Sequence, residues 1–487
     1  MEKQLQQLLA HVAVRQVVGN ANVAITSITN DSRQAQPGAL FIAVKGVAVD
    51  AHQFIPQVVE AGAAAVVCEE LPASLHDGVT YIKVDNSIIA LAHIAGVWYD
   101  YPSTKLKLVG VTGTNGKTSI ASLLYSLTQM MGYKAGLLST VKNVVDRKVY
   151  PAKQTTPDHL TLNRLLAEMV DAGCDYAFME VSSHACAQHR IEGLTFAGGV
   201  FTNLTRDHLD FHKTVDAYIK AKKSFFDGLG SDAFALVNAD DKVGAVMLQN
   251  CAARHYTYSL RTLADFKAQV IEERLDGSTI TLNGKELEVA FTGRFNVYNL
   301  AAVYGVAVLL GFDAHDVAVK TSLLKPVQGR FQTLRSPRGY VAVVDYAHTP
   351  DALVNVLSTI HDVLGSNGKV ITVCGCGGNR DKGKRPIMAA EAANRSHQVI
   401  LTSDNPRNED PDEIIREMEA GLSEQARRHV LKITDRKEAI KAACQFANPG
   451  DVVLVAGKGH ETYQEINGVK HHFDDTEVLT QIFNHEQ

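Results

Sequence analysis

Short apolar runs alternate with segments of helical spacing in the first hundred residues, and this alternation predicts an α/β domain. The runs at 39–44 and 63–67 predict buried strands, and the segment 51–61 between them predicts a helix. The polar, proline-containing stretch at 99–103 interrupts the pattern and predicts a linker. The first domain is therefore expected to span residues 1–102.

A second unit of the same class follows. An apolar run, a glycine-rich turn and a helix succeed one another at its start, and later strands alternate with helices, which is typical of a mostly parallel sheet. This central domain is expected to span residues 103–329. Strands are expected at 106–111, 176–181, 199–201 and 233–237, and further β structure at 279–290. Helices are expected at 119–131 and 299–310.

The last part of the chain, residues 330–487, repeats the alternation and predicts a second doubly wound, Rossmann-like domain. Its strands are expected at 340–344, 370–373, 398–401 and 451–456. The predicted fold class is therefore α/β, with three domains and mostly parallel sheets.

Composition narrows the classes of partner and compartment. The 487 residues include 48 basic and 53 acidic ones, a formal net charge of -5, so neither nucleic acid nor an anionic membrane is favoured as the main partner. No apolar run approaches the ~20 residues that cross a bilayer, and the first residues lack the apolar core of a signal peptide. The seven cysteines, an odd number, favour a reducing compartment. A cytoplasmic protein is expected.

The strongest local motif is the run GVTGTNGKT at 110–118, between a predicted strand and a predicted helix. Glycines let several backbone N–H groups point at one anion, and a helix N-terminus adds partial positive charge. In this setting Lys117 can reach the outer phosphates of a nucleotide, and the Thr118 hydroxyl can coordinate Mg²⁺. The glycines at 110, 113 and 116 depart from the standard spacing, so an ordinary glycine-rich turn is the alternative.

Two further positions indicate a metal near this loop. Glu180 ends a predicted strand, at the edge where α/β sheets bind ligands. His208 belongs to the ionisable run RDHLDFH at 206–212, and a neutral imidazole can bind a metal. The alternatives are a solvated strand end for Glu180 and a capping or surface role for His208.

Six ordered blocks resemble motifs of the Mur ligase family, whose glycine-rich loop has the same offset spacing. The resemblance covers nearly the whole chain and is closest to the MurE branch. It implies one domain for a UDP-sugar, a central ATPase domain and a C-terminal Rossmann-like domain. The blocks are GTNGKT at 113–118, EVSSH at 180–184, TNLTRDHLD at 202–210, NVYN at 296–299, GRF at 329–331 and DYAHTP at 345–350.

The resemblance also implies a reaction. ATP would phosphorylate the free carboxylate of D-glutamate in UDP-MurNAc-L-Ala-D-Glu, and the amine of a diamino acid would then displace phosphate from the acyl phosphate. Phosphorylation supplies the leaving group that a carboxylate lacks, and cations must neutralise the two anionic substrates as they meet. ATP and Mg²⁺ are the implied cofactors.

The resemblance assigns roles around the ATP site. Lys117, Glu180, His208 and Lys222 are implied to be catalytic, and Thr118 joins the last three in holding magnesium. Helix caps at Asn296 and Asn299, and a turn cap at Asp345, are the alternatives. The residues implied to bind ATP are Gly113, Thr114, Asn115, Gly116, Lys117, Thr118, Ser119, Asn296, Asn299, Arg330 and Asp345.

Lys222 lies in the lysine-rich segment YIKAKK at 218–223, which resembles the family segment that contains a carbamylated lysine. Addition of CO₂ turns the cation into an anion, which can hold a second Mg²⁺ directly or through water. A plain solvated lysine is the alternative, and Lys220 or Lys223 is the matching residue if the register differs.

Eight residues are candidates for binding the nucleotide-linked dipeptide. The turn NDSR at 30–33 resembles the family's uridine-diphosphate segment, and Arg190 can pair with a carboxylate or phosphate. The family commonly has Asn where this chain has Gln154. The eight candidates are Asn30, Ser32, Gln154, Thr155, Thr156, Ser182, Gln188 and Arg190.

The motif DNPR at 404–407 matches the pattern of family members that add meso-diaminopimelate rather than L-lysine. The two amino acids differ by one distal carboxylate, and Arg407 offers a planar charged fork for it. Arg380 is assigned to the other carboxylate and Glu461 to the distal ammonium. A proline turn with surface charges is the alternative. The candidate residues are Arg380, Asp404, Asn405, Pro406, Arg407, Gly457 and Glu461.

Other functions remain open. An L-lysine-adding enzyme, the ligase that adds the next peptide and a folylpolyglutamate synthase belong to the same superfamily, and DNPR argues against them. A non-catalytic nucleotide-binding protein is the alternative from another class, and the presence of Lys117, Thr118, Glu180 and His208 argues against it. A monomer without nucleic acid or membrane insertion is expected.

Overall fold

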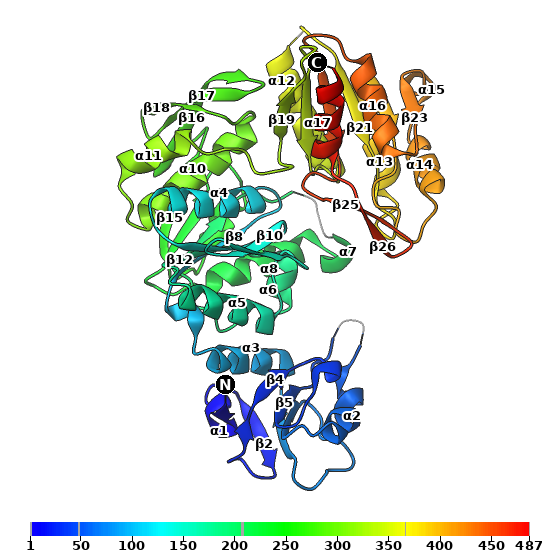
Figure 1. Cartoon of the computed structure of the whole chain (residues 1–487). Helices are drawn as coiled ribbons and strands as arrows, with labels where there is room; N and C mark the ends of the chain where they lie inside the picture. Colours follow the sequence, from blue (N-terminus) through cyan, green and yellow to red (C-terminus); the bar gives the residue numbers. More distant parts are fainter. Residues whose placement is uncertain (1, 47–48, 206–208, 366, 487) are drawn as a thin grey trace. The chain divides into compact units, whose positions relative to one another are not determined.

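The computed structural model describes residues 2–46, 49–205, 209–365 and 367–486 (Figure 1). Within this part of the chain, no helix is both long and apolar enough to cross a lipid bilayer. The chain divides into two compact units. Unit 1 comprises Met1–Thr202, Asp216–Val237 and Lys242–Tyr256, and unit 2 comprises Asn203–Val215, Asn238–Asp241 and Thr257–Gln487.

Unit 1 begins with a sheet in the order β2-β7-β6-β5-β4, which is parallel except for β2 against β7. The two predicted strands are confirmed as β5 (Ala39–Ile42) and β6 (Ala65–Cys68), whose alternate residues enter two cores, one on each face. The predicted helix at 51–61 is divided into η2 (Ala51–Phe54) and α2 (Ile55–Glu60), because Pro56 has no N–H and starts a new helix. The other elements are β1 (Lys3–Gln4), α1 (Leu5–Leu8), β2 (Val14–Val18), β3 (Ala24–Ile25), β4 (Ser27–Thr29), η1 (Ser32–Gln34), β7 (Thr80–Val84), α3 (Ser87–Trp98) and η3 (Pro102–Thr104).

The second sheet of unit 1 carries the glycine-rich loop. β8 (Lys107–Thr112) is parallel to β12 (Tyr176–Glu180) on one side and to β13 (Gly198–Phe201) on the other, so three carboxyl ends meet at one edge. α4 (Lys117–Met130) packs on this sheet and begins two residues before the predicted helix. The predicted strands are confirmed. The remaining elements are β9 (Ala135–Leu138), β10 (Lys142–Val145), β11 (Lys148–Pro151), α5 (His159–Asp171), α6 (Ser183–Ala187), α8 (Val215–Asp227), β14 (Phe234–Asn238) and α9 (Gly244–Leu248).

Unit 2 contains an antiparallel extension, in which β16 (Phe266–Arg274), β17 (Gly277–Leu282) and β18 (Lys285–Val289) pair in order and α10 (Arg294–Leu309) packs against β16. The sequence predicted β structure at 279–290 but missed β16. Several charged and exposed residues at the end of β16 hide the apolar alternation that marks a strand. Unit 2 also contains α7 (Leu209–His212) and α11 (Ala314–Ser322), and β15 (Arg254–Ser259) enters unit 2 at Thr257.

The C-terminal sheet of unit 2 has the order β19-β20-β24-β21-β22-β23, in which β19 is antiparallel to its neighbour and the other pairs are parallel. Helices α12, α13 and α14 cover one face and α16 and α17 the other, so each face has its own core (Figure 1). The four strands predicted here are confirmed. The elements are β19 (Gln332–Arg335), β20 (Val341–Asp345), α12 (Pro350–Leu364), β21 (Val370–Cys374), α13 (Lys384–Arg395), β22 (Gln398–Leu401), α14 (Pro411–Glu419), α15 (Glu424–Arg427), β23 (Val430–Lys432), α16 (Arg436–Phe446), β24 (Val452–Ala456), β25 (Tyr463–Ile466), β26 (Val469–His472) and α17 (Asp475–His485).

Candidate active site

The three glycines of the 110–118 motif are required for different structural reasons. Gly113 and Gly116 have φ of +146° and +91°, which side chains rarely adopt, and Gly116 is the N-cap of α4. Gly110 lies inside β8, where a Cβ atom would come within 2.6 Å of the Phe225 ring. The offset spacing therefore combines one glycine required for packing with two that shape the loop.

The side chain of Lys117 folds back over the glycine-rich loop that precedes it. Its Nζ donates hydrogen bonds to the carbonyl oxygens of Gly113 at 3.0 Å and Thr114 at 2.8 Å. On the far side of the loop, the Thr202 hydroxyl donates to the carbonyl oxygen of Asn115 at 2.6 Å. The side chains of the next two residues, Thr118 and Ser119, are buried. The ammonium is therefore held at the place where a cradle of this kind binds phosphate.

Glu180 ends β12 in register with Val111 of β8, one strand away from the start of the loop. Its side chain is 1% exposed, and its Oε1 accepts a hydrogen bond from the backbone N–H of Thr140 at 2.7 Å. This is not the solvated strand end that was the alternative. The loop, Thr118 and Glu180 thus follow neighbouring strands, whereas His208 lies outside the described residues.

Lys222 is the buried lysine of α8. Its side chain is 1% exposed, its Nζ donates to the Gly113 carbonyl oxygen at 2.8 Å, and it lies 4.6 Å from the centre of the Tyr218 ring. Lys220 is exposed, and Lys223 pairs with Asp227. The plain solvated lysine is therefore wrong for position 222, and only this one of the three lysines reaches the loop.

Arg190 brings together three of the residues predicted to bind the dipeptide. Its guanidinium donates to Oε1 of Gln188 at 2.6 and 3.0 Å, to the carbonyl oxygen of Thr156 at 2.7 Å, and to Oε1 of Gln154. Burial lowers the pKa of Arg190, while Asp158 opposes that shift. Gln154 therefore reaches the cluster although the family commonly has the shorter amide.

Thr156 joins this cluster to Glu180, the carboxylate that is predicted to bind metal. Its hydroxyl donates to the carbonyl oxygen of Glu180 at 2.8 Å and lies 3.2 Å from the Ser182 hydroxyl, which caps α6. Thr155 accepts a hydrogen bond from the Thr140 hydroxyl at 3.1 Å. Six of the eight predicted dipeptide-binding residues thus form one network beside the glycine-rich loop.

The other two candidates lie in the N-terminal sheet. Asn30 follows β4 and is exposed, and Ser32 begins the η1 turn. Between them, Asp31 accepts two hydrogen bonds from the Arg33 guanidinium, at 2.8 and 2.7 Å, and these lower the pKa of the Asp31 carboxyl. The structure gives this turn a defined shape, and its ligand stays a prediction.

Asn296 and Asn299 are both buried in the first turns of α10 in unit 2. Nδ2 of Asn296 donates to the carbonyl oxygen of Thr292 at 2.9 Å, and Nδ2 of Asn299 lies 3.4 Å from Oδ1 of Asn296. The residue that caps the helix is Gly293, so the alternative that these asparagines are N-caps is wrong.

Arg330 precedes β19 and Asp345 ends β20, and because these two strands are antiparallel the two residues lie close together. Oδ2 of Asp345 accepts the backbone N–H of Phe331 at 2.7 Å. Burial raises the pKa of the Asp345 carboxyl to about 6, while Arg330 and backbone N–H groups lower it. One of these N–H groups belongs to Ala347, and this hydrogen bond is the predicted cap of the following turn. The Arg330 guanidinium lies 4.7 Å from the centre of the Tyr346 ring. Sequence reasoning missed Tyr346, although it lies within the DYAHTP block.

Asn405 and Glu461 meet at the carboxyl ends of β22 and β24. Nδ2 of Asn405 donates to Oε2 of Glu461 at 2.7 Å. Gly457 has φ of +116°, and a Cβ atom there would lie 2.5 Å from Oδ2 of Asp404. Its N–H donates to the Asp345 carbonyl oxygen at 3.0 Å, so the predicted ATP residue and the predicted amino-acid residues are directly connected. Pro406 is buried beside them.

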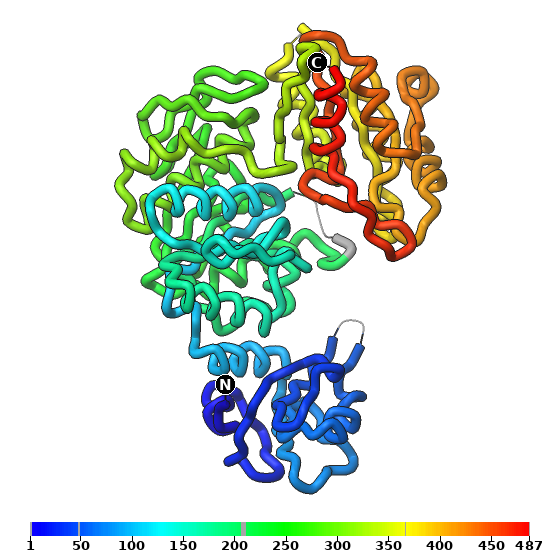
Figure 2. The backbone as a smooth tube through the Cα atoms, in the orientation of Figure 1, coloured from blue at the N-terminus to red at the C-terminus, as the bar shows by residue number. Residues whose placement is uncertain are grey.

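Arg407 is partly buried, with 21% of its side chain exposed. Its Nη1 donates to the Gly378 carbonyl oxygen at 2.8 Å, and its Nε lies 3.5 Å from Oε2 of Glu465. Its backbone pairs with the β25–β26 hairpin, which Figure 2 shows in red at one end of the C-terminal sheet. Arg380 is exposed, and its side chain approaches Gly377, as that of Arg407 does.

Arg385 is a residue that sequence reasoning missed. It is fully buried, and its guanidinium donates to Glu409 at 2.9 and 3.0 Å, to Glu417 at 2.6 Å and to the Gly377 carbonyl oxygen at 3.1 Å. It therefore ties the glycine-rich segment before Arg380 to the segment after DNPR. Its position in the basic run GGNRDKGKR gave no sign that it is buried while its neighbours are exposed.

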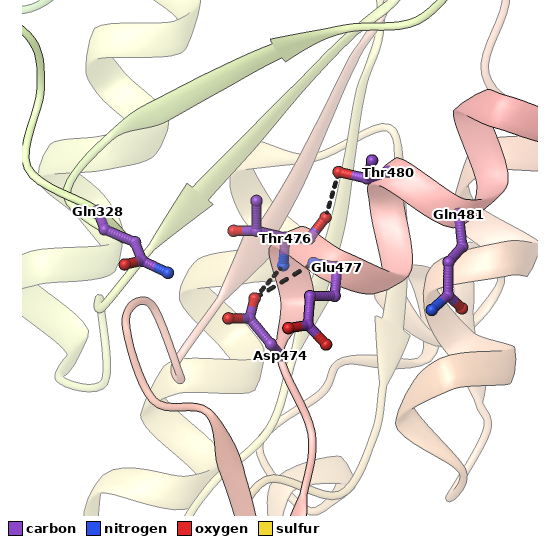
Figure 3. Close-up of a pocket in the computed structure, with 6 residues that line it drawn as sticks. All are labelled: Gln328, Asp474, Thr476, Glu477, Thr480 and Gln481. Carbon is purple, nitrogen blue, oxygen red and sulfur yellow. Dashed lines mark hydrogen bonds between the residues drawn. The ribbon is translucent and has the colours of Figure 1, made fainter.

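A separate hollow in unit 2 does not contain any of these residues. Gln328, Asp474, Thr476, Glu477, Thr480 and Gln481 line it (Figure 3). Asp474 caps α17 by accepting the backbone N–H groups of Thr476 and Glu477 at 2.7 and 3.2 Å. Its carboxylate therefore serves the helix, and this hollow offers no constellation for catalysis.

Comparison with known proteins assigns the family. A model of the Mur ligase middle domain matches residues 111–307, a model of the Mur ligase glutamate ligase domain matches residues 329–459, and a model of the Mur ligase family catalytic domain matches residues 24–100. Together these matches cover more than half of the chain.

Relatives and solved structures agree with this assignment. UDP-N-acetylmuramoyl-L-alanyl-D-glutamate–2,6-diaminopimelate ligases of Bacteroides fragilis and Cytophaga hutchinsonii are 58% and 54% identical, each over 99% of this chain and 99% of the relative. A solved structure of a ligase of the same name is 32% identical, covers 100% of this chain and 99% of that chain, and has a TM-score of 0.71. The MurF ligase of Thermotoga maritima in complex with ADP, 20% identical with a TM-score of 0.59 and coverage of 94% and 97%, shares the fold. The chain belongs to the Mur ligase family.

Proposed function

We propose that this chain is an ATP-dependent ligase that joins meso-diaminopimelate to UDP-MurNAc-L-Ala-D-Glu through an acyl phosphate, in the cytoplasmic synthesis of peptidoglycan precursors. The observation that carries the proposal is identity of 57–58% over 99% of the chain to ligases whose names state these substrates. The DNPR motif supports the choice of amino acid. A monomer is proposed.

The reaction has two steps. The dipeptide carboxylate attacks the terminal phosphorus of ATP, and ADP leaves. The amine of the incoming amino acid then attacks the acyl carbon, phosphate leaves, and the new amide bond forms. The first step brings two anions together, and Lys117 in the loop is the cation that neutralises charge on the transferring phosphoryl group.

A magnesium site beside the loop fits the residues that the structure describes there. Mg²⁺ prefers hard oxygen ligands, which the Thr118 hydroxyl and the buried Glu180 carboxylate provide. His208 and Lys222 complete the proposed set, Lys222 after carbamylation, because its ammonium cannot coordinate a cation. When bound, the ion would screen the phosphate charges. Without it, Lys117 still holds the loop carbonyl oxygens at 2.8 and 3.0 Å.

The proposed ATP-binding residues are those of the glycine-rich loop, two asparagines of α10, Arg330 and Asp345. The loop residues cradle the phosphates through their N–H groups, while Arg330 and Asp345 orient the nucleotide. The raised pKa of Asp345, about 6, is typical of a buried functional carboxyl. The proposed set is Gly113, Thr114, Asn115, Gly116, Lys117, Thr118, Ser119, Asn296, Asn299, Arg330 and Asp345.

The network around Arg190 is proposed to bind the dipeptide and its carboxylate. A half-buried guanidinium with neutral partners at 2.6–3.0 Å retains a charge for an anionic substrate. The proposed set is Asn30, Ser32, Gln154, Thr155, Thr156, Ser182, Gln188 and Arg190. Residues 1–102, 103–329 and 330–487 are then the domains for the UDP-sugar, ATP and the amino acid.

The amino acid is proposed to lie between the glycine-rich segment 377–380 and the segment 404–407. Arg407 and Arg380 receive its two carboxylates, and Glu461 with Asn405 receives an ammonium. The proposed set is Arg380, Asp404, Asn405, Pro406, Arg407, Gly457 and Glu461.

Product mass tests the proposal. The purified chain is incubated with ATP, Mg²⁺, UDP-MurNAc-L-Ala-D-Glu and either meso-diaminopimelate or L-lysine, and each component is omitted in turn. The mass of the diaminopimelate adduct is expected only when all components are present, together with phosphate release. A lysine adduct in preference would support the lysine-adding alternative, and binding of ATP without any adduct would support the non-catalytic one.

A further inference from the structure

Lys458 is completely buried beside the proposed amino-acid site. Its side chain is 0% exposed. Its Nζ donates to Oδ1 of Asn405 at 3.2 Å and to Oε2 of Glu461 at 3.3 Å, and it lies 5.6 Å from the centre of the Tyr463 ring. A buried ammonium is costly unless it is paired, so its place between these two side chains requires an explanation.

The ammonium fixes the orientation of the Asn405 amide. Oδ1 of Asn405 accepts both Nζ of Lys458 and the backbone N–H of Glu465, the latter at 2.9 Å. Since two donors hold the oxygen, the amide nitrogen must face Glu461, to which it donates at 2.7 Å. An inverted amide would place its N–H groups against both donors.

The same ammonium opposes the charge of a second carboxylate. The groups that face Glu461 are Asp404 from the segment after β22, Tyr346 from the segment after β20, and Lys458 from its own loop. Burial first, and Asp404 second, raise the pKa of the Glu461 carboxyl, while Lys458 and Asn405 lower it. Within the described part of the chain, both hydrogen bonds to Glu461 end on Oε2, so Oε1 remains available to a ligand.

We propose that Lys458 is a positioning residue, which keeps the Glu461 carboxylate ionised and aligned with Asn405 so that Oε1 receives an ammonium group of the incoming amino acid. This inference rests on the proposed function. It predicts that an ammonium group of the zwitterionic substrate binds to a carboxylate that already has an internal partner. Without Lys458, the pKa of the Glu461 carboxyl would rise further, and its attraction for the ammonium would be lost at a higher pH than in the wild type.

The test is the pH dependence of kcat/KM for meso-diaminopimelate in Lys458→Met. An opposite charge at this distance typically shifts a carboxyl pKa by about one to three units. The acidic limb of the profile is therefore expected to move upward by about one to two pH units in the variant, with recovery toward the wild-type value at higher pH. The profile of kcat/KM for ATP should not move.

Lys470→Met is the matched control. Lys470 is an exposed lysine 4.0 Å from the centre of the same Tyr463 ring, on the other strand of the hairpin. Its replacement removes one positive charge from the same ring and should leave the profile for diaminopimelate unchanged.

A uniform loss of kcat/KM at every pH in a folded Lys458→Met, or an unchanged profile, would overturn the inference. If this variant does not fold, Lys458→Gln with Glu461→Gln replaces the charged pair by neutral groups of similar size. The double variant should lack the acidic limb, and persistence of that limb would reject the role of Glu461. Failure of the proposed function is distinguishable, because the wild type would then make no diaminopimelate product.

Discussion

The Nζ atom of Lys222 donates a hydrogen bond to the carbonyl oxygen of Gly113 at 2.8 Å, although 109 residues separate them in the chain. A buried lysine thus ends at the first glycine that shapes the loop. The centre of the Tyr218 ring lies 4.6 Å from the same ammonium. A CO₂ adduct on this amine would replace the ammonium by an anion at the loop.

If Lys222 is carbamylated, Lys222→Ala should lose most of its ligase activity, and added short carboxylates should restore part of it by replacing the missing anion. Product formation with and without added acetate or formate measures this. Lys220→Ala, the change of an exposed lysine on the same helix, is the control and should behave as wild type. Full activity of Lys222→Ala without any added carboxylate would reject the modification.

Lys117→Ala should abolish ligation while the chain remains folded. Removal of a cation aimed at a transferring phosphoryl group typically costs about 10²-fold or more in rate. The measurement is phosphate release in the presence of all three substrates, with circular dichroism as the check on folding. Near-normal turnover by the folded variant would contradict the role of Lys117.

Arg407→Ala should reduce the use of meso-diaminopimelate far more than the use of L-lysine. Loss of one partner of a buried charged pair typically costs ~2–5 kcal/mol, or roughly 30- to 5,000-fold. Arg407→Lys should restore only part of the preference, because a point charge cannot copy a bidentate fork. Competition between the two amino acids, measured by product mass, checks both expectations.

Arg416→Ala is the control for this experiment. Arg416 is 64% exposed on α14 and pairs with Glu413 one turn away, so its loss should not change the preference. A wild type that uses both amino acids equally, or prefers lysine, would refute the substrate assignment and leave the ligase reaction unaffected.

The buried carboxyl of Asp345 should make the free energy of unfolding depend on pH. Burial raises the pKa of its carboxyl from 3.8 to about 6, so the native state holds this proton more tightly than the unfolded state does. Its stabilising contribution is therefore present below about pH 4 and is lost as the pH rises through about 6, with a total of about 3 kcal/mol. The difference in unfolding free energy between wild type and Asp345→Asn should change over this window and be constant above it. Urea denaturation between pH 4 and 8 measures it, and parallel curves would show that Asp345 does not titrate there.

Arg436 and Asp475 form a fully buried ion pair in the C-terminal core, with both side chains 0% exposed and contacts of 2.8 and 2.7 Å. Arg436→Met leaves the Asp475 charge unpaired and should lower stability by ~3–5 kcal/mol. Arg436→Met combined with Asp475→Leu should lose much less, because no charge then remains buried. Chemical denaturation of the two variants tests this, and equal losses would contradict it.

Much of the fold was predictable from the sequence, because buried parallel strands are marked by continuous apolar runs. The strands β5, β8, β12, β20 and β22 are of this kind, and their positions agree with the prediction. β16 was missed because the charged residues Glu272, Glu273 and Arg274 at its end interrupt the apolar alternation. The split at Pro56 depends on where one helical turn ends and the next begins, which the periodicity does not resolve.

The candidate site was predictable as a set of motifs but not as a geometry. Helical spacing places Lys222 on the same face of α8 as Tyr218, Phe225 and Phe226, unlike Lys220. The position of Lys222 beside Gly113 depends on how α8 crosses the sheet, which this spacing does not give. Lys458 and Arg385 are lysine and arginine in basic or glycine-rich runs, where exposed side chains are the usual case. Their burial follows from long-range packing, which only the folded chain reveals.

The backbone of Arg407 has φ of +51°, in the left-handed region. A side chain there is tolerated best when it is Asn, Asp or Gly, and a β-branched residue meets a steric penalty of roughly 1–2 kcal/mol before any substrate is considered. The number of single substitutions that can change the amino-acid preference at this position is therefore small. Loss of the Arg407 side chain alone should narrow the preference, whereas an evolutionary or engineered switch to a different amino acid should also require a remodelled loop.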